Sequence, residues 1–295
     1  MKKKIILLIY SLVIALSVTA CSKEEVNKEL VNMFDEISEE DLVDGAEVEQ
    51  IFREGLAIAN AENNITISVE NDVIYGEGDT AEKSNYNTHL KIANEDDKKI
   101  SSIEMSSVIN EESSKIVGFF DNDKFYFTVS DGTKVMEDMT YDTFIGVIDN
   151  YSLVISLDSI DKAAIIEDKD GSKELYIQYD AVKLEKQMQT NLEAEGEIGV
   201  DGETLNINYS NVYAKLDKDN NLLNYSYIVD ANYTMDSESV PYKYTLATSF
   251  TDRGNTSVDK LDNPQGYMST EEYSKYMTEQ LSRTAEESNS DTAID

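Results

Sequence analysis

The residues best suited to catalysis or metal binding are scarce in this chain. Cys21 is the only cysteine and His89 the only histidine among 295 residues. A single cysteine permits no internal disulfide and no Cys-based metal cluster, and a single histidine excludes a metal site built on paired histidines. The composition does not exclude a Ser-His-Asp triad that uses His89. However, the sequence contains no nucleophile elbow or glycine-rich oxyanion loop to accompany it. We therefore expect His89 to lie on a sheet surface, and we expect a protein that is not an enzyme and needs no metal or cofactor.

Carboxylates, in contrast, are abundant: 59 Asp and Glu stand against 25 Lys and Arg, for a formal charge of −34. So acidic a chain lacks the cations that neutralise phosphate backbones, which excludes nucleic acid as a partner. Calcium binding is one interpretation of the acids, and solubility is the simpler one that we favour. Asp217–Asn221 begins like an EF-hand loop, but Leu222 replaces the turn glycine and Ile228 stands where the bidentate glutamate should be. Asp168-Lys169-Asp170-Gly171 ends in the Asp-Gly pair typical of a hairpin turn.

The first twenty residues have the pattern of an export signal. Three lysines at positions 2 to 4 precede the apolar run Ile5–Leu16, and small residues follow up to Ala20. A membrane-spanning helix needs about 20 apolar residues, and this run is shorter. The segment Val18-Thr19-Ala20-Cys21 resembles the lipobox of bacterial lipoproteins. That resemblance implies cleavage before Cys21, a diacylglyceryl group on its sulfur, and attachment to the outer face of the cell membrane through two acyl chains.

Alternation of apolar and polar residues, the pattern of a strand with one buried face, recurs along the rest of the chain. It is found in Ile65–Glu70, Tyr86–Ile92, Ile103–Met105, Phe125–Val129, Leu175–Tyr179, Leu205–Tyr209, Leu223–Tyr227 and Tyr242–Phe250. Short turns rich in Asp, Asn and Gly separate these runs, so we expect neighbouring strands to pair as an antiparallel meander, with one face buried and the other in water.

Helical spacing of apolar residues predicts helices over Ala46–Ala61, Tyr141–Tyr151 and Ala181–Ala194. We expect an α+β fold, in which a curved, mostly antiparallel sheet has its apolar face covered by these helices. The expected organisation is a signal peptide at 1–20, a lipidated acidic tether at 21–45 and a sheet domain at 46–268. Residues 269–295 would form a polar helix, capped by Ser269 or Thr270, and a disordered tail.

The order of these elements resembles the LolA/LppX-like superfamily. The most telling part is Phe119–Phe127 followed by Gly132-Thr133-Lys134-Val135, which looks like the aromatic hairpin of uncharacterised lipoproteins from low-GC Gram-positive bacteria. The resemblance implies a half-barrel whose concave apolar side, roofed by helices, accepts acyl chains. Carriers of this fold shuttle lipids or lipoproteins, but the anchor cysteine of this chain favours capture of a ligand close to the membrane.

Two functions therefore stay open. In the first, a membrane-anchored lipoprotein binds a hydrophobic or amphipathic ligand, such as a lipid or lipoprotein acyl chains, between sheet and helices. Residues expected to line that site are Ile67, Val69, Ile103, Met105, Phe125, Phe127, Phe144, Ile148, Tyr209, Tyr225, Tyr227, Tyr244 and Leu246. In the second, a non-enzymatic structural or protein-interaction lipoprotein of the envelope fills its interior with its own side chains. Tyrosines at strand spacing fit either function, because they can line a cavity or pack a sheet.

Overall fold

The computed structural model describes residues 33–35, 37–78, 81–95, 98–109, 112–148, 153, 155–195, 204–235, 238–259, 261 and 264–279. The export signal, Cys21, most of the tether and the end of the chain lie outside these residues, so the predictions made for them stay predictions. Within the described residues, every helix is too short or too polar to cross a bilayer.

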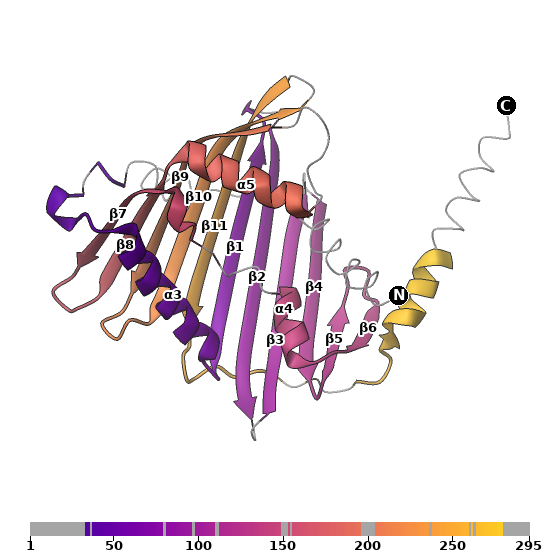
Figure 1. The fold of residues 1–295 in the computed structure, drawn as a ribbon. Helices are drawn as coiled ribbons and strands as arrows, with labels where there is room; N and C mark the ends of the chain where they lie inside the picture. Colours follow the sequence, from indigo (N-terminus) through magenta and orange to yellow (C-terminus); the bar gives the residue numbers. More distant parts are fainter. Residues whose placement is uncertain are drawn as a thin grey trace, which may run out of the picture.

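The chain forms a 12-stranded, mostly antiparallel open sheet with helices beside it (Figure 1). The helices are α3 (Gly45–Ala61), α4 (Tyr141–Ile148) and α5 (Ala181–Glu195), with short 3-10 turns η1 (Glu39–Asp41) and η3 (Leu157–Ser159) and a last helix over 270–279. The strands are β1 (Ile65–Tyr75), β2 (Glu82–Glu95), β3 (Lys98–Ile109), β4 (Glu112–Asp121), β5 (Lys124–Thr128), β6 (Lys134–Asp138), β7 (Ile160–Glu167), β8 (Lys173–Tyr179), β9 (Thr204–Leu216), β10 (Leu222–Met235), β11 (Glu238–Thr251) and β12 (Met268–Ser269).

The sheet consists of two meanders joined edge to edge. The spatial order is β12-β6-β5-β4-β3-β2-β1-β11-β10-β9-β8-β7, so β1–β6 run outward in one direction and β11–β7 in the other. The joint is the long antiparallel pair β1–β11, in which Ile67 lies opposite Phe250 and Tyr75 opposite Tyr242. Local pairing of neighbouring strands is therefore confirmed within each half. The central pairing and the parallel pair β12–β6 were not predicted.

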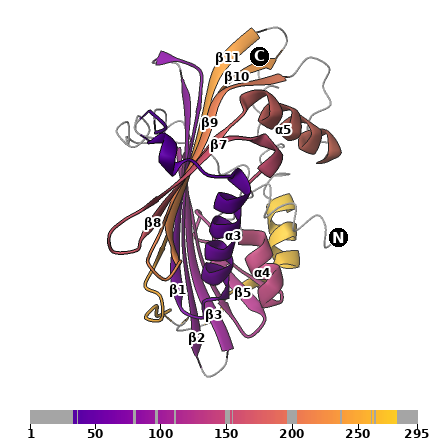
Figure 2. The ribbon, with the colours of Figure 1, turned by 60° about the vertical axis from the view of Figure 1, so that its left-hand side comes forward.

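All three predicted helices pack on one face of the sheet, which we call the helix side (Figures 1 and 2). On α3, Phe52 meets the Tyr225 ring edge-on at a centroid distance of 5.4 Å. On α4, Phe144 stacks on Phe120 at 5.0 Å and contacts Phe125 at 5.1 Å. The helix α5 contacts β9 and η3 and lies toward the other end of the strands from α3 and α4. One end of the helix side is thus filled by aromatic packing.

The residues at the start of α3 explain how this helix can approach the sheet so closely. Asp44 caps the helix, with its Oδ1 accepting a hydrogen bond from the Ala46 amide at 2.9 Å. A Cβ on Gly45 would lie 2.9 Å from two side-chain atoms of Ile160 on β7. Glycine therefore lets the helix begin in direct contact with the edge strand.

The opposite face of the sheet was expected to stay in water, and this is wrong at two places. Residues after β11 cover one apolar cluster, made of Ala93, Ile100, Phe119 and Val258. Residues before η1 cover another, in which Met33 and Phe34 pack on Ile228, Tyr176, Tyr209 and Tyr213. A twisted sheet of this width carries apolar residues on both faces, and irregular segments bury those that the helices do not reach.

Candidate ligand-binding face

Tyrosines gather on the helix side toward the end of the strands where α5 lies. Five of them, Tyr75, Tyr86, Tyr227, Tyr242 and Tyr244, point to this side from β1, β2, β10 and β11, and we call them the tyrosine face. Their positions follow from strand register: Tyr242 lies opposite Tyr75, Tyr244 opposite Val73, and Tyr86 opposite Asn71. All five are only partly buried, unlike the residues packed beneath α3 and α4.

Four of these phenols, those of Tyr86, Tyr227, Tyr242 and Tyr244, have a pKa above the ordinary tyrosine value. Loss of hydration raises the pKa of Tyr86 and of Tyr242 to about 12, with smaller contributions from neighbouring tyrosines. Burial likewise raises the pKa of Tyr227 and Tyr244 above the ordinary value of 10.0. The Asn71 amide nitrogen donates a hydrogen bond to the Tyr244 hydroxyl at 3.2 Å. Each phenol can therefore donate and accept a hydrogen bond beside an apolar ring.

Buried polar atoms without partners accompany the tyrosines. Among the described residues, the hydroxyls of Ser107 and Thr248 and the amide oxygen of Asn71 have no hydrogen-bond partner. Ser107 is 3% exposed and Thr248 2%. Ser107 lies directly opposite Tyr86, and Thr248 opposite Val69. Since buried polar atoms are normally paired with protein or water, these atoms mark a place where a further partner is expected.

Charge is absent from the inner part of this face. One row of side chains runs across the strands through Val212, Tyr227, Leu246, Asn71, Tyr86 and Ser107, and the next through Tyr225, Thr248, Val69, Thr88 and Met105. Neither row contains a charged residue. In the outer rows on the same side, Glu82 lies opposite Tyr75 and Glu112 opposite Ile109, and both are exposed.

The structure brings together most of the residues predicted to line a ligand site. Twelve of the thirteen lie on the helix side or on α4: Ile67, Val69, Ile103, Met105, Phe125, Phe127, Phe144, Ile148, Tyr225, Tyr227, Tyr244 and Leu246. Most of them are fully buried, several beneath α3 and α4, and only Met105, Tyr227 and Tyr244 are partly exposed. The predicted set thus contains both core residues and part of the tyrosine face.

Tyr209 is the exception, and the prediction that it shares this side is wrong. It lies opposite Asp230 and packs with Ile228 in the cluster on the other face. A β-bulge in β9 explains the reversal, because Tyr209 pairs with Asp230 while Ile207 pairs with the next residue, Ala231. The extra residue shifts the alternation by one, so Ile207 and Tyr209 point to opposite sides.

Six residues of the tyrosine face and its unpaired polar groups are not among the predicted site residues: Asn71, Tyr75, Tyr86, Ser107, Tyr242 and Thr248. A signal for the first two was present, because alternation beginning at Ile65 continues through Asn71 to Tyr75. A polar residue on the buried side interrupts an apolar pattern, so the predicted strand ended before Asn71. Ser107 gave no signal of its own, since its burial depends on the register of β3 against Tyr86.

His89 lies on the opposite face, as expected for a sheet-surface residue. It lines a polar depression of about 390 Å³ together with Ser68, Glu70, Glu104 and small polar residues of β2, β10 and β11. The Nδ1 atom of His89 is 3.0 Å from the Ser68 hydroxyl. The neighbouring Glu104 carboxylate forms an ion pair with Lys115 at 2.7 Å. This surface can hydrogen-bond a polar molecule, and the carboxylate of Glu104, which lies opposite His89 across the strand pair, forms an ion pair with a lysine.

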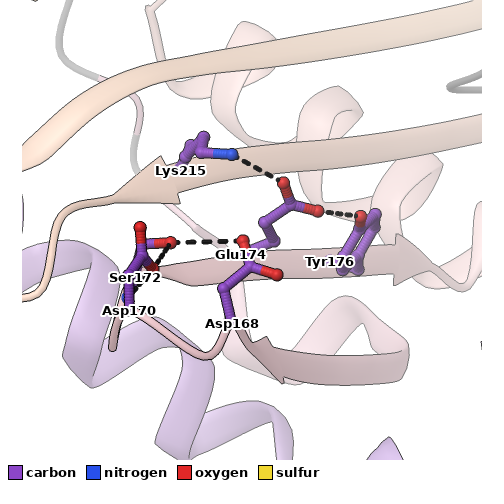
Figure 3. A network of polar contacts seen from close by, with 6 residues as sticks. All are labelled: Asp168, Asp170, Ser172, Glu174, Tyr176 and Lys215. Atoms are coloured by element: carbon purple, nitrogen blue, oxygen red, sulfur yellow. Dashed lines mark hydrogen bonds and ion pairs between the residues drawn. The ribbon is translucent and has the colours of Figure 1, made fainter.

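The two acidic segments considered for cation binding form turns. At the β7–β8 turn, the Ser172 hydroxyl donates to Asp170 at 2.8 Å and to Asp168 at 3.2 Å (Figure 3). At the β9–β10 turn, Asp217 Oδ1 accepts from the amides of Asp219 and Asn221, each at 2.9 Å. In the part of the chain that the structure describes, no three His, Cys, Asp or Glu side chains are placed to hold a metal ion.

Comparisons with known proteins give limited likenesses. No protein-family model and no curated protein matches the chain. Among solved structures, the chain resembles Rv2717c from M. tuberculosis (9% identity, TM-score 0.21, covering 66% of this chain and 96% of that one). It also resembles a porin-like protein from Bacteroides uniformis (10%, 0.22, covering 64% and 96%). A third is a domain from Vibrio parahaemolyticus provisionally described as an outer membrane lipoprotein-sorting protein (9%, 0.20, covering 69% and 91%). At such low identity and TM-score, these likenesses assign neither a family nor a function.

Proposed function

We propose that this protein binds an amphipathic, lipid-like ligand on the tyrosine face, beside α5. The observation that supports this best is the difference in exposure of the aromatic rings between the two ends of the helix side. Beneath α3 and α4, aromatic rings such as Phe52, Phe144 and Tyr225 fill the space. Beside α5, partly exposed phenols lie next to buried polar atoms that have no partner among the described residues. An amphipathic ligand would cover the rings and pair those atoms.

The proposal places the protein at the outer face of a cell membrane, attached through lipidated Cys21. Because the anchor keeps the protein at the bilayer, the ligand would be captured locally and not carried over long distances. Kinship with the LolA/LppX-like superfamily is part of this proposal and rests on element order. No catalytic step is included in the proposed function.

A structural or protein-interaction lipoprotein without a ligand is the alternative. It requires α5 to close the tyrosine face with side chains that satisfy Asn71, Ser107 and Thr248. In that case the phenols would be packing residues, and a lipid probe would have no preferred position on the domain.

Photo-crosslinking tests the proposal on the full chain. We expect a monoacylglycerol with a diazirine in its acyl chain to label peptides from β1, β2, β10 and β11, as mapped by mass spectrometry. Replacing Tyr227 and Tyr244 together with leucine should reduce labelling at least tenfold. The matched control is Tyr209→Leu, a partly buried tyrosine on the opposite face, which should leave labelling unchanged. Labelling spread evenly over the domain, or equal loss in the control, would favour the alternative.

A further inference from the structure

We infer that the part of the ligand lying on the tyrosine face is uncharged and carries hydroxyl or carbonyl groups, as in an acylglycerol. This inference rests on the proposed function and narrows the class of ligand. It predicts that a lipid with the same chain and glycerol but an added phosphate is bound more weakly.

The first argument is the absence of a counter-charge. The two inner rows of this surface contain no Lys, Arg or His, and the nearest charged residues in the outer rows are the acids Glu82 and Glu112. Over residues 181–188 of α5, whose side chains are described, Lys183 and Lys186 are exposed and Leu184 is buried. An anionic headgroup would lose hydration on this surface without gaining an ion pair, and that loss is costly. The formal charge of −34 for the whole chain adds repulsion.

The second argument is the supply of hydrogen-bonding groups. Tyr86, Tyr242 and Tyr244 present protonated phenols, and Asn71 presents an amide oxygen that has no partner among the described residues. A plain hydrocarbon would cover these groups without pairing them, and each buried polar atom left unpaired disfavours binding. A glycerol hydroxyl can donate to the Asn71 oxygen, ester and hydroxyl oxygens can accept from the phenols, and neither group carries a charge. A neutral acylglycerol therefore fits both the polarity and the charge of the surface.

Competition between matched lipids tests this inference. The full chain, purified in detergent, is labelled with the photoreactive monoacylglycerol in the presence of monooleoylglycerol, 1-oleoyl lysophosphatidate or octadecene. Monooleoylglycerol and lysophosphatidate differ by one phosphate, and octadecene has no polar group. We expect monooleoylglycerol to block labelling of the tyrosine-face peptides at a concentration at least tenfold lower than either competitor. The variant Asn71→Leu should reduce the advantage over octadecene, whereas Tyr209→Leu should retain it.

The outcomes separate this inference from the proposed function. If lysophosphatidate or octadecene competes as well as monooleoylglycerol, the surface binds lipids without the selectivity inferred here, and the inference fails alone. If the tyrosine-face peptides are not labelled above the rest of the domain, the proposed function and the inference fail together. If monooleoylglycerol keeps its tenfold advantage over octadecene in Asn71→Leu, the role given to Asn71 is overturned. Selection against charge is judged separately, from the advantage of monooleoylglycerol over lysophosphatidate.

Discussion

Glu174 on β8 shows how a partly buried carboxylate can stabilise the edge of the sheet. It accepts hydrogen bonds from Lys215 at 3.0 Å and from Tyr176 at 2.6 Å (Figure 3). Burial by itself would raise the pKa of Glu174, but the hydrogen bonds from Tyr176 and Lys215, with the lysine charge, lower it below 4.5 overall. The ionised form is therefore favoured in the folded state, and its stabilisation is complete above pH 4.5 and is lost as the pH falls through the lowered pKa.

Glu174→Gln should lower the free energy of unfolding by about 1 kcal/mol at pH 7, because the pair is only partly shielded from water. The deficit should shrink at pH 3, where a larger fraction of the wild-type carboxylate is protonated than at pH 7. Urea denaturation at both pH values measures this. Glu104→Gln, which breaks the more exposed pair with Lys115, is the control and should have less effect at pH 7. An equal deficit at both pH values would mean that the substitution acts through shape and not through charge.

Gly118 on β4 is needed because of its neighbour across the strand pair. A Cβ at this position would overlap the ring of Phe125 and lie 3.0 Å from Ile103. We expect Gly118→Ala to destabilise the protein by about 1–3 kcal/mol, as overpacking of a core does. The matched control is Gly146→Ala on α4, where a Cβ meets nothing within 4 Å and alanine favours the helix by up to about 1 kcal/mol. Thermal denaturation of both variants checks the difference, and an unchanged midpoint for Gly118→Ala would show that Phe125 can move aside.

At the scale of elements, the first half of α5, over residues 181–188, fully buries one of its described side chains. Asp180 caps its first turn, accepting from the amides of Val182 at 3.0 Å and Lys183 at 3.1 Å. Over residues 181–188, whose side chains are described, Leu184 is the one fully buried and Val182 is 76% exposed. A helical segment with one fully buried side chain opens at lower free energy than the core, so we expect residues 181–188 to open before the sheet does.

Leu184→Ala should therefore loosen α5 without unfolding the sheet. We expect hydrogen exchange of the α5 amides to become at least tenfold faster, because a buried leucine contributes about 2–5 kcal/mol. Exchange in β1 and β2 should remain unchanged. Val182→Ala removes a similar apolar side chain from the exposed side of the same turn and should leave exchange unaltered. Faster exchange throughout the sheet would show instead that α5 and the core unfold as one unit.

For the whole molecule, the decisive prediction concerns Cys21. Because Cys21 is the only cysteine, a single substitution removes the only sulfur to which a diacylglyceryl group could be attached. Cys21→Ser should release the exported protein from the membrane fraction and abolish incorporation of labelled palmitate. Cell fractionation and metabolic labelling measure the two effects. Continued membrane retention of the variant would mean that the apolar leader itself, left uncleaved, serves as the anchor.

The strands and helices were largely predictable, since each depends on residues close in sequence. Alternation within β1, β8 and β11 and helical spacing in α3 and α5 arise from packing one side of a single element. The capped turn before the last helix follows from local chemistry as well, with Ser269 and Glu272 exchanging hydrogen bonds at 2.7 and 3.2 Å. These features required no knowledge of the fold.

By itself, the sequence determined the acidic charge, the export and anchoring pattern, and most of the segments that form strands. Only the tertiary structure decided which sides meet, because pairings such as Asn71 with Tyr244, 173 residues apart, depend on the register of distant strands. The bulge that turns Tyr209 away, the unpaired Ser107 and the central β1–β11 pair are all of this kind. A one-residue shift reverses every side chain beyond it, so the composition of a face is a property of the assembled sheet.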